Sequence, residues 1–168
     1  MLADFALRVA TPEDETSVSE LLQASYSVLL PPSYDEAILA AALPVITRAN
    51  PALLSAGTFF VAETAGGLII GCGGWTLESP GKGDFVPELG HIRHFAVHPK
   101  WIGRTIGRSI FTMCEEQARS ANVRRFECYS GLNSEGFYAA LGFEPIRQMA
   151  IPMGQGVKLP VVVMQRSI

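Results

Sequence analysis

The sequence is poor in cysteine. Its 168 residues include three cysteines, Cys72, Cys114 and Cys128, and no two of them form a CxxC pair. An odd number of widely spaced cysteines argues against a disulfide framework and against a zinc site. Each cysteine is most simply a small buried apolar side chain, and we expect no metal.

Charge is also scarce. Charged residues make up 17% of the chain and apolar residues 48%, and the formal net charge is −3. The composition is that of a globular protein, and the length suits one domain over residues 1–168. A slightly acidic chain is a poor match for nucleic acid or for an anionic membrane. No apolar run reaches the roughly 18–20 residues that span a bilayer, and residues 1–10 lack a signal-peptide core. We therefore expect a cytoplasmic protein with neither partner.

Acidic residues are missing altogether from one long segment. Between Leu89 and Cys114 there is no Asp or Glu, although the chain holds 16 of them. The same segment carries all three histidines and the basic residues Arg93, Lys100, Arg104 and Arg108. A local excess of positive charge in a mildly acidic chain indicates a site for an anion.

Hydrophobic periodicity and turn signals predict elements in the order β-α-α-β-β-β-α-β-α-β-β. The expected strands cover residues 5–9, 58–63, 68–77, 89–97, 123–129, 143–152 and 159–165. The first helix should begin after Thr11 and stop before Pro31, and Ser33 should cap a second helix that Pro44 kinks or ends early. This order describes a mixed α/β domain with antiparallel hairpins at both ends and a β-α-β crossover in the middle.

Two glycine clusters invite comparison with phosphate loops. The run GCGGW, residues 71–75, lies inside a predicted strand with no helix behind it, so a bulge or a close backbone approach explains it better. The run IGRTIGR, residues 102–108, lies between a strand and a helix. Unpaired N–H groups and the helix dipole at that end would suit a polyphosphate. An ordinary helix start with solvated arginines is the alternative.

Two longer motifs resemble a known family. The segment HFAVHPKWIGRTIGRSIF, residues 94–111, is similar to the acetyl-CoA-binding segment of the GNAT superfamily of N-acetyltransferases, and NSEGFYAALGFEP, residues 133–145, is similar to its downstream Asn…Tyr…Gly-Phe block. The resemblance implies the GNAT fold, a mostly antiparallel twisted central sheet with helices on both faces. Ile102 and Thr105 depart from the family pattern, since relatives carry Arg or Gln and Gly there.

The resemblance also implies an acetyl-CoA site. The fourth predicted strand and the turn and helix after it would bind the cofactor. The pantetheine arm would contact Phe95, Ala96 and Val97, and the phosphates would contact Ile102, Gly103, Arg104, Thr105, Ile106, Gly107 and Arg108. Asn133 would contact the pantetheine or the sulfur region. Dimerisation through the last strands is a family habit, so a homodimer is possible.

The implied reaction is direct attack of an amine on the thioester. Tyr138 matches the family tyrosine that would protonate the departing thiolate. His91 is the expected base and Glu88 the alternative, since His91, Arg93, Phe95 and Val97 share one face of a regular strand. His94 and His98 would then be structural.

The sequence contains few signals for the acceptor amine. Arg93, Trp75 and Glu88 are the expected acceptor-site residues, and Glu78, Asp84 and Glu88 favour a cationic amine, of a small molecule or a peptide. Two alternatives remain: a GNAT-fold module that binds CoA or a partner without turnover, and an enzyme for a larger acyl group, which the space near Trp75 and Phe95 would distinguish.

Overall fold

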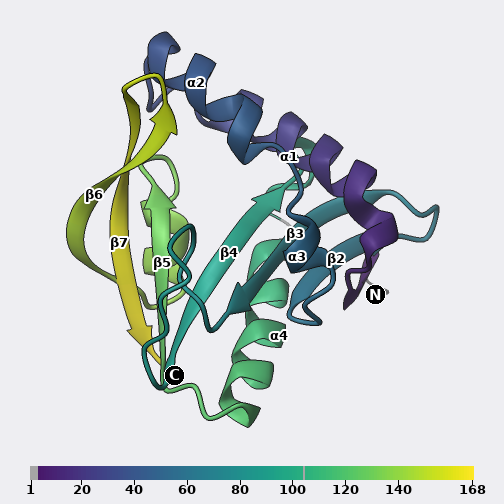
Figure 1. Cartoon of the computed structure of the whole chain (residues 1–168). Helices are drawn as coiled ribbons and strands as arrows, with labels where there is room; N and C mark the ends of the chain where they lie inside the picture. Colours follow the sequence, from purple (N-terminus) through teal and green to yellow (C-terminus); the bar gives the residue numbers. More distant parts are fainter. Residues whose placement is uncertain (1–3, 104) are drawn as a thin grey trace.

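The protein is built around one seven-stranded sheet, seen in a computed structural model that describes residues 4–103 and 105–168 (Figure 1). The strand order is β1-β2-β3-β4-β5-β7-β6. The strands are β1 Phe5–Val9, β2 Phe59–Thr64, β3 Ile69–Thr76, β4 Leu89–Val97, β5 Arg125–Gly131, β6 Glu144–Gly154 and β7 Val157–Ser167. Every neighbouring pair is antiparallel except β4 and β5, which are parallel. The expected hairpins and central crossover are confirmed.

Helices cover both faces of this sheet (Figure 1). Helices α1 (Glu15–Leu29), α2 (Glu36–Ile46) and α3 (Pro51–Leu54) lie on one face, and α4 (Ile106–Ser120) and α5 (Glu135–Ala140) pack on the other. The α4 face buries Ile110 and Phe111 against Phe126, whereas the α1 face buries Leu22 against Val61. All three cysteines are free and buried, as expected. No described helix is long and apolar enough to cross a membrane.

The start of α2 differs from the prediction, and Pro44 does not end the helix early. Its N-cap is Asp35, whose Oδ1 accepts from the Ile38 N–H at 3.1 Å, and not Ser33. Pro44 lies inside α2, which continues to Ile46. Proline removes the N–H that would bond the carbonyl four residues earlier, and that carbonyl belongs to the exposed residue Ala40, where water can satisfy it. Helix α3 had no clear sequence signal, being only one turn long.

The glycine run on β3 allows close packing. A Cβ on Gly71 would lie 2.5 Å from Cγ2 of Ile106, and one on Gly73 would lie 2.6 Å from the ring of Phe95. The absence of these side chains lets the first turn of α4 and the Phe95 ring rest directly on the sheet. The expectation of a close backbone approach over residues 71–75 is confirmed.

Strands β4 and β5 separate soon after they meet. They pair only from Leu89–Arg125 to His91–Glu127, after which β4 stays with β3 and β5 stays with β7. Figure 1 shows the two strands diverging beyond this point. The divergence leaves one edge of β4 without a strand partner, and this opening positions the site.

A β-bulge in β4 lies beside the opening. Arg93 pairs with Gly74 and Ala96 pairs with Cys72, so β4 has one extra residue, and His94 takes a φ of +49°. A bulge of this kind reverses the alternation of side chains. Phe95 and Val97 therefore pack toward α4, and Ala96 packs toward α1. The prediction that His91, Arg93, Phe95 and Val97 share a face is wrong, because it assumed a regular strand.

Candidate active site

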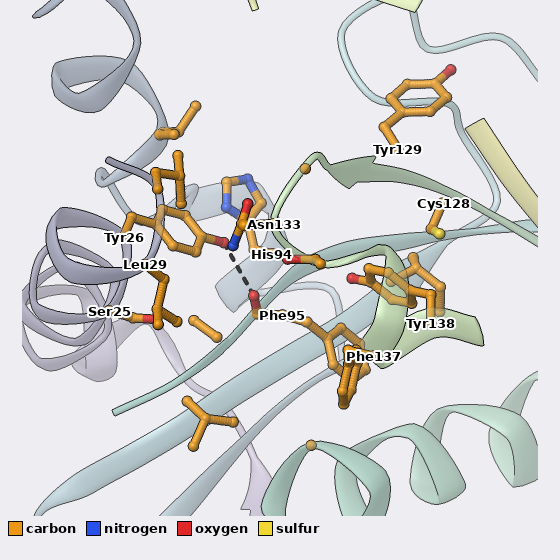
Figure 2. A pocket seen from close by; sticks show the side chains of 18 of the residues that line it. Ser25, Tyr26, Leu29, His94, Phe95, Cys128, Tyr129, Asn133, Phe137 and Tyr138 are labelled. Carbon is orange, nitrogen blue, oxygen red and sulfur yellow. Dashed lines mark hydrogen bonds between the residues drawn. The ribbon is translucent and has the colours of Figure 1, made fainter. Parts of the chain in front are cut away.

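A cavity of about 710 Å³ occupies the opening between β4 and β5. Its walls come from α1, the amino end of α4, α5, the bulged part of β4, and the β6–β7 hairpin. Figure 2 shows part of its lining, with Tyr26 on one side and Tyr138 on the other. Elements from both halves of the sheet thus converge on one space.

The amino end of α4 forms one end of this cavity. The expected phosphate-binding residues Ile102, Gly103, Thr105, Ile106, Gly107 and Arg108 all line it, and Arg104 lies outside the described residues. Among the described residues, the first bond of the helix is the one that the Ser109 N–H donates to the Thr105 carbonyl. The three preceding N–H groups therefore have no acceptor within the helix. Together with the helix dipole they give this end of the cavity a positive potential.

Thr105 occupies a left-handed backbone position. Its φ is +65°, and it is the N-cap of α4 without a side-chain capping bond. This conformation costs a β-branched residue roughly 1–2 kcal/mol, whereas glycine adopts it readily. The backbone at Thr105 thus takes the conformation that a glycine would adopt. Threonine in place of the family's glycine therefore adds backbone strain and leaves the course of the turn unchanged.

The open edge of β4 presents peptide groups to the cavity. The His98 N–H donates to the Ile70 carbonyl, and Val97 pairs with Gly71. Antiparallel strands alternate the direction of their peptide groups, so the N–H and C=O of Val97 point away from β3, toward the opening. Those of Ala96 point toward Cys72. The Phe95 carbonyl accepts a hydrogen bond from the Tyr26 hydroxyl at 3.2 Å (Figure 2). Of the three peptide units expected to face a ligand, that of Ala96 faces β3.

Tyr138 brings one hydroxyl into this space. Its ring is buried on α5 between Phe137 and Phe143, with centroid distances of 5.1 and 5.5 Å. The hydroxyl points into the cavity (Figure 2), and no hydrogen bond to a described residue holds it. Burial raises the pKa of Tyr138 well above its ordinary value of 10.0. At neutral pH the side chain is therefore a proton donor with no acceptor among the described residues.

Asn133 lines the same cavity. A Cβ on Gly131 would lie 2.6 Å from Oδ1 of Asn133, so the glycine leaves room for this amide. Arg93 also lines the cavity, beyond the bulge. The cavity thus combines a positive end, an open strand edge and an unbonded phenol, which suits a thioester-bearing nucleotide.

The family model described as acetyltransferase (GNAT) domain matches residues 55–145, more than half of the chain. The chain belongs to the GNAT acetyltransferase family. Its fold and the family resemblance of both motifs are thereby confirmed, and acetyltransferase activity in general follows. No curated protein sequence matches the chain significantly.

Solved structures of other GNAT proteins share this fold. A GCN5-related N-acetyltransferase from Rhodopseudomonas palustris superposes with a TM-score of 0.80 at 23% identity, covering 100% of this chain and 98% of that one. The PaiA N-acetyltransferase from Thermoplasma acidophilum, in complex with coenzyme A, gives 0.72 at 16% identity, covering 98% and 99%. Ard1 from Thermoplasma volcanium gives 0.65 at 17%, covering 99% of both chains. At these identities the likeness concerns the fold.

The GNAT cavity does not include every residue expected from the sequence. His91 is buried outside the lining, its Nδ1 3.8 Å from Oε1 of Glu127, and burial lowers its pKa. Trp75 lies in the core on the α4 face, where its Nε1 donates to Oε1 of Gln117 at 2.7 Å. Glu88 is exposed, 3.7 Å from Nε of Arg124. None of the three lines the cavity, so the space near Trp75 cannot distinguish acyl groups.

Two lining residues were missed or misassigned from the sequence. His94 was expected to be structural, yet the bulge brings it to the cavity wall, where burial and Arg93 lower its pKa to about 4. Its imidazole is therefore neutral at pH 7. Tyr26 was not considered, although a tyrosine on the apolar side of the first helix was a signal for a buried hydroxyl with a partner.

Proposed function

We propose that the protein transfers the acetyl group of acetyl-CoA to a primary amine by direct attack. The observation that carries this proposal is the buried Tyr138 hydroxyl, unbonded within the described residues and facing the cavity at the open edge of β4. A phenol held there is the proton donor that a departing thiolate needs. The coenzyme A bound to the PaiA N-acetyltransferase supports the choice of cofactor.

The cofactor would lie along the cavity from α4 to the bulge. The pyrophosphate would accept from the first N–H groups of α4, and Arg108, with Arg104, would add positive charge. The pantetheine arm would then donate an N–H to the open Val97 carbonyl, as an added strand does, and the Val97 N–H would stay available for the thioester oxygen. Asn133 would contact the arm close to the sulfur.

The chemical step moves one acetyl group and two protons. The amine must be neutral, so its ammonium form first loses a proton to solvent. The amine nitrogen then forms a bond to the thioester carbon, and the Val97 N–H would stabilise the resulting oxyanion. The carbon–sulfur bond breaks as Tyr138 donates its proton to the sulfur. The nitrogen releases its extra proton to solvent, and the Tyr138 phenolate regains a proton from solvent. The products are the N-acetyl amide and free CoA thiol.

In this proposal the amine proton leaves through His94, whereas the sequence analysis expected His91 to accept it. His91 lies outside the cavity lining, so this proposal does not use it. No carboxylate lines the cavity in the described part of the chain, and His94 is the imidazole that does. A neutral imidazole with a low pKa holds a proton only briefly, so His94 would pass it to solvent.

Release of CoA thiol in the presence of an amine tests the proposal. Mass spectrometry should find one added acetyl group on the amine, in the same amount as the thiol released. Thiol release without an acetylated amine would indicate thioester hydrolysis, and no release despite bound acetyl-CoA would indicate a module that binds without turnover.

A further inference from the structure

The cavity has a cofactor end and an opposite end. Strand β4 runs from Arg93 through the bulge to Val97 and then through residues 98–105 into α4. If the phosphates bind at α4 and the thioester lies at Val97, as in the proposed function, Arg93 lies beyond the thioester. The span from Val97 to Arg93 is at most about 14 Å along an extended chain. Arg93 is therefore within reach of an acceptor that is bound next to the thioester.

Much of the cavity wall outside α4 and β4 is apolar. The lining side chains there come from α1, α2 and the β6–β7 hairpin: Leu29, Leu30, Ile46, Ile151, Met153, Leu159 and Val161. They belong to one hydrophobic cluster that joins α2 to the hairpin. Tyr34 adds a hydroxyl that is already used, since it donates to the Pro160 carbonyl and accepts from the Leu132 N–H. An acceptor with an apolar body fits this wall.

The acceptor end offers no counter-ion to a second ammonium group. No described Asp or Glu lines the cavity. Glu78 and Asp84, which favoured a cationic amine in the sequence, are exposed on the loop after β3 and outside the lining. Burying a polycationic amine against apolar side chains without paired charges is costly.

Apart from Arg108 on α4, Arg93 is the charged side chain in the described cavity lining. It is half-buried, and its Nη1 donates to Oγ1 of Thr76 at 2.9 Å. No described carboxylate lies within 4.0 Å of the Arg93 guanidinium. The negative charge of Glu78 attracts the guanidinium from a greater distance. A guanidinium carries five N–H donors that suit a carboxylate in a two-pronged contact. A half-buried arginine with most donors unused at a substrate cavity points to an anionic group on the ligand.

We infer that the acceptor is an amine with an apolar body and one carboxylate, the class to which apolar α-amino acids belong. The inference rests on the proposed acetyl transfer. The apolar wall holds the side chain, Arg93 holds the carboxylate, and the amine faces the thioester near Val97. The product is the N-acetyl derivative of that acid, with CoA thiol released.

Matched pairs of amines test this inference. The probes are L-phenylalanine against phenethylamine and L-leucine against isoamylamine, pairs that differ only in the carboxylate, with spermidine as the polycation. We expect kcat/KM to be at least tenfold higher for each amino acid than for its decarboxylated partner, and higher still than for spermidine.

Substitution of Arg93 assigns the effect to one residue. Arg93→Gln should raise KM for L-phenylalanine at least tenfold and leave phenethylamine within twofold, and Arg93→Lys should restore part of the difference. Arg125→Gln is the matched control, because Arg125 is exposed at the far end of β5 and outside the lining.

The outcomes separate the two proposals. A preference for spermidine or for phenethylamine, or an equal loss for both members of a pair in Arg93→Gln, overturns the acceptor inference and leaves acetyl transfer standing. If none of the five amines is acetylated, the acceptor inference is overturned. If acetyl-CoA also fails to bind, the proposed function falls with it.

Discussion

Removal of the Tyr138 hydroxyl should separate chemistry from folding. In Tyr138→Phe the ring keeps its packing against Phe137 and Phe143. The hydroxyl makes no hydrogen bond to a described residue, so its loss leaves no internal partner unsatisfied. We expect the free energy of unfolding to change by less than about 0.5 kcal/mol. The melting temperature and the affinity for acetyl-CoA should stay at wild-type values.

The rate of transfer should fall steeply in the same variant. A positioned general acid contributes roughly 100- to 10,000-fold, and about 1.36 kcal/mol of barrier corresponds to each tenfold. We expect kcat to drop at least about 100-fold, or about 2.7 kcal/mol. The assay is thiol release at saturating acetyl-CoA and amine.

The pH profile gives an independent check on Tyr138. Burial keeps its pKa above 10.0, so the hydroxyl stays protonated at neutral pH and contributes no loss of activity up to that value. Unchanged kcat in Tyr138→Phe, or a wild-type decline near neutral pH that the variant abolishes, would refute the assigned role. Tyr34→Phe is the matched control for stability: its hydroxyl holds two hydrogen bonds, so this variant should melt lower.

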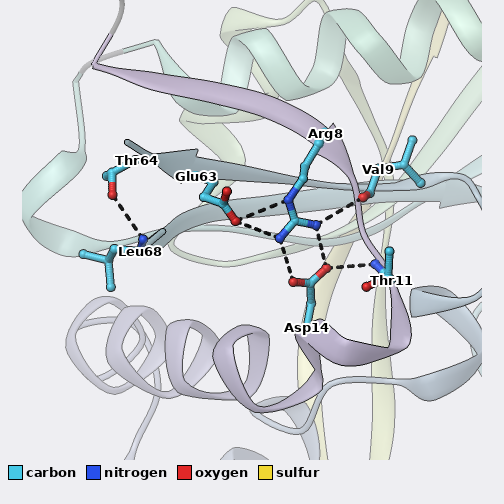
Figure 3. Close-up of polar contacts among 7 residues, drawn as sticks. All are labelled: Arg8, Val9, Thr11, Asp14, Glu63, Thr64 and Leu68. Carbon is cyan, nitrogen blue, oxygen red and sulfur yellow. Dashed lines mark hydrogen bonds and ion pairs between the residues drawn. The ribbon is translucent and has the colours of Figure 1, made fainter. Parts of the chain in front are cut away.

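Two further predictions concern stability. Thr105→Gly should relieve roughly 1–2 kcal/mol of left-handed strain and cost about 0.5–1 kcal/mol of glycine entropy, so the free energy of unfolding should rise by about 0.5–1 kcal/mol. The control variant Thr112→Gly, in the regular part of α4, should be less stable than wild type. Loss of stability in both variants would contradict the strain argument. Arg8 bridges Asp14 and Glu63 at 2.8 Å each (Figure 3), and the Arg8 hydrogen bonds are the main cause of the lowered Asp14 pKa. This contribution is present above the unfolded pKa of about 4 and is lost as pH falls through the folded value. Arg8→Met should therefore cost about 2 kcal/mol at neutral pH, allowing for the partial exposure of Arg8, and lower the melting temperature by about 4–8 °C. The difference from wild type should shrink in acid; an equal difference at both pH values would argue against this ion pair.

Local patterns in the sequence predicted most of the fold. Strands β1 and β4 begin and end at the expected residues, because alternation and flanking turn residues define them without help from the rest of the chain. The glycine-containing turn before α4 was equally readable, since strand, turn and helix follow one another directly. The position of Trp75 could also have been predicted from the sequence, because the two-residue period of a strand places it on the same face as Gly71 and Gly73, which is the α4 face.

The geometry around His94 could not be read from the sequence. A non-glycine residue at positive φ carries no composition signal, and the bulge depends on how β4 aligns with β3. One extra residue moves His94 to the cavity and leaves Arg93 beyond it. The separation of β4 from β5 depends on β7, which lies about 30 residues later in the chain and pairs with all of β5. The sequence alone therefore could not show that His91, Trp75 and Glu88 lie outside the cavity lining.

Calorimetric titration with acetyl-CoA tests the central claim most directly, namely that the opening at β4 and α4 binds the cofactor. Gly103 and Gly57 give a matched pair of variants, because both have positive φ, 84° and 78°, and neither would place a Cβ within 4 Å of another residue. Only Gly103 lines the cavity. We predict micromolar binding that desulfo-CoA retains and ATP does not match, weakened at least about tenfold (1.4 kcal/mol) by Gly103→Ala and unaffected by Gly57→Ala. No binding up to millimolar acetyl-CoA, or equal losses in both variants, would contradict the account.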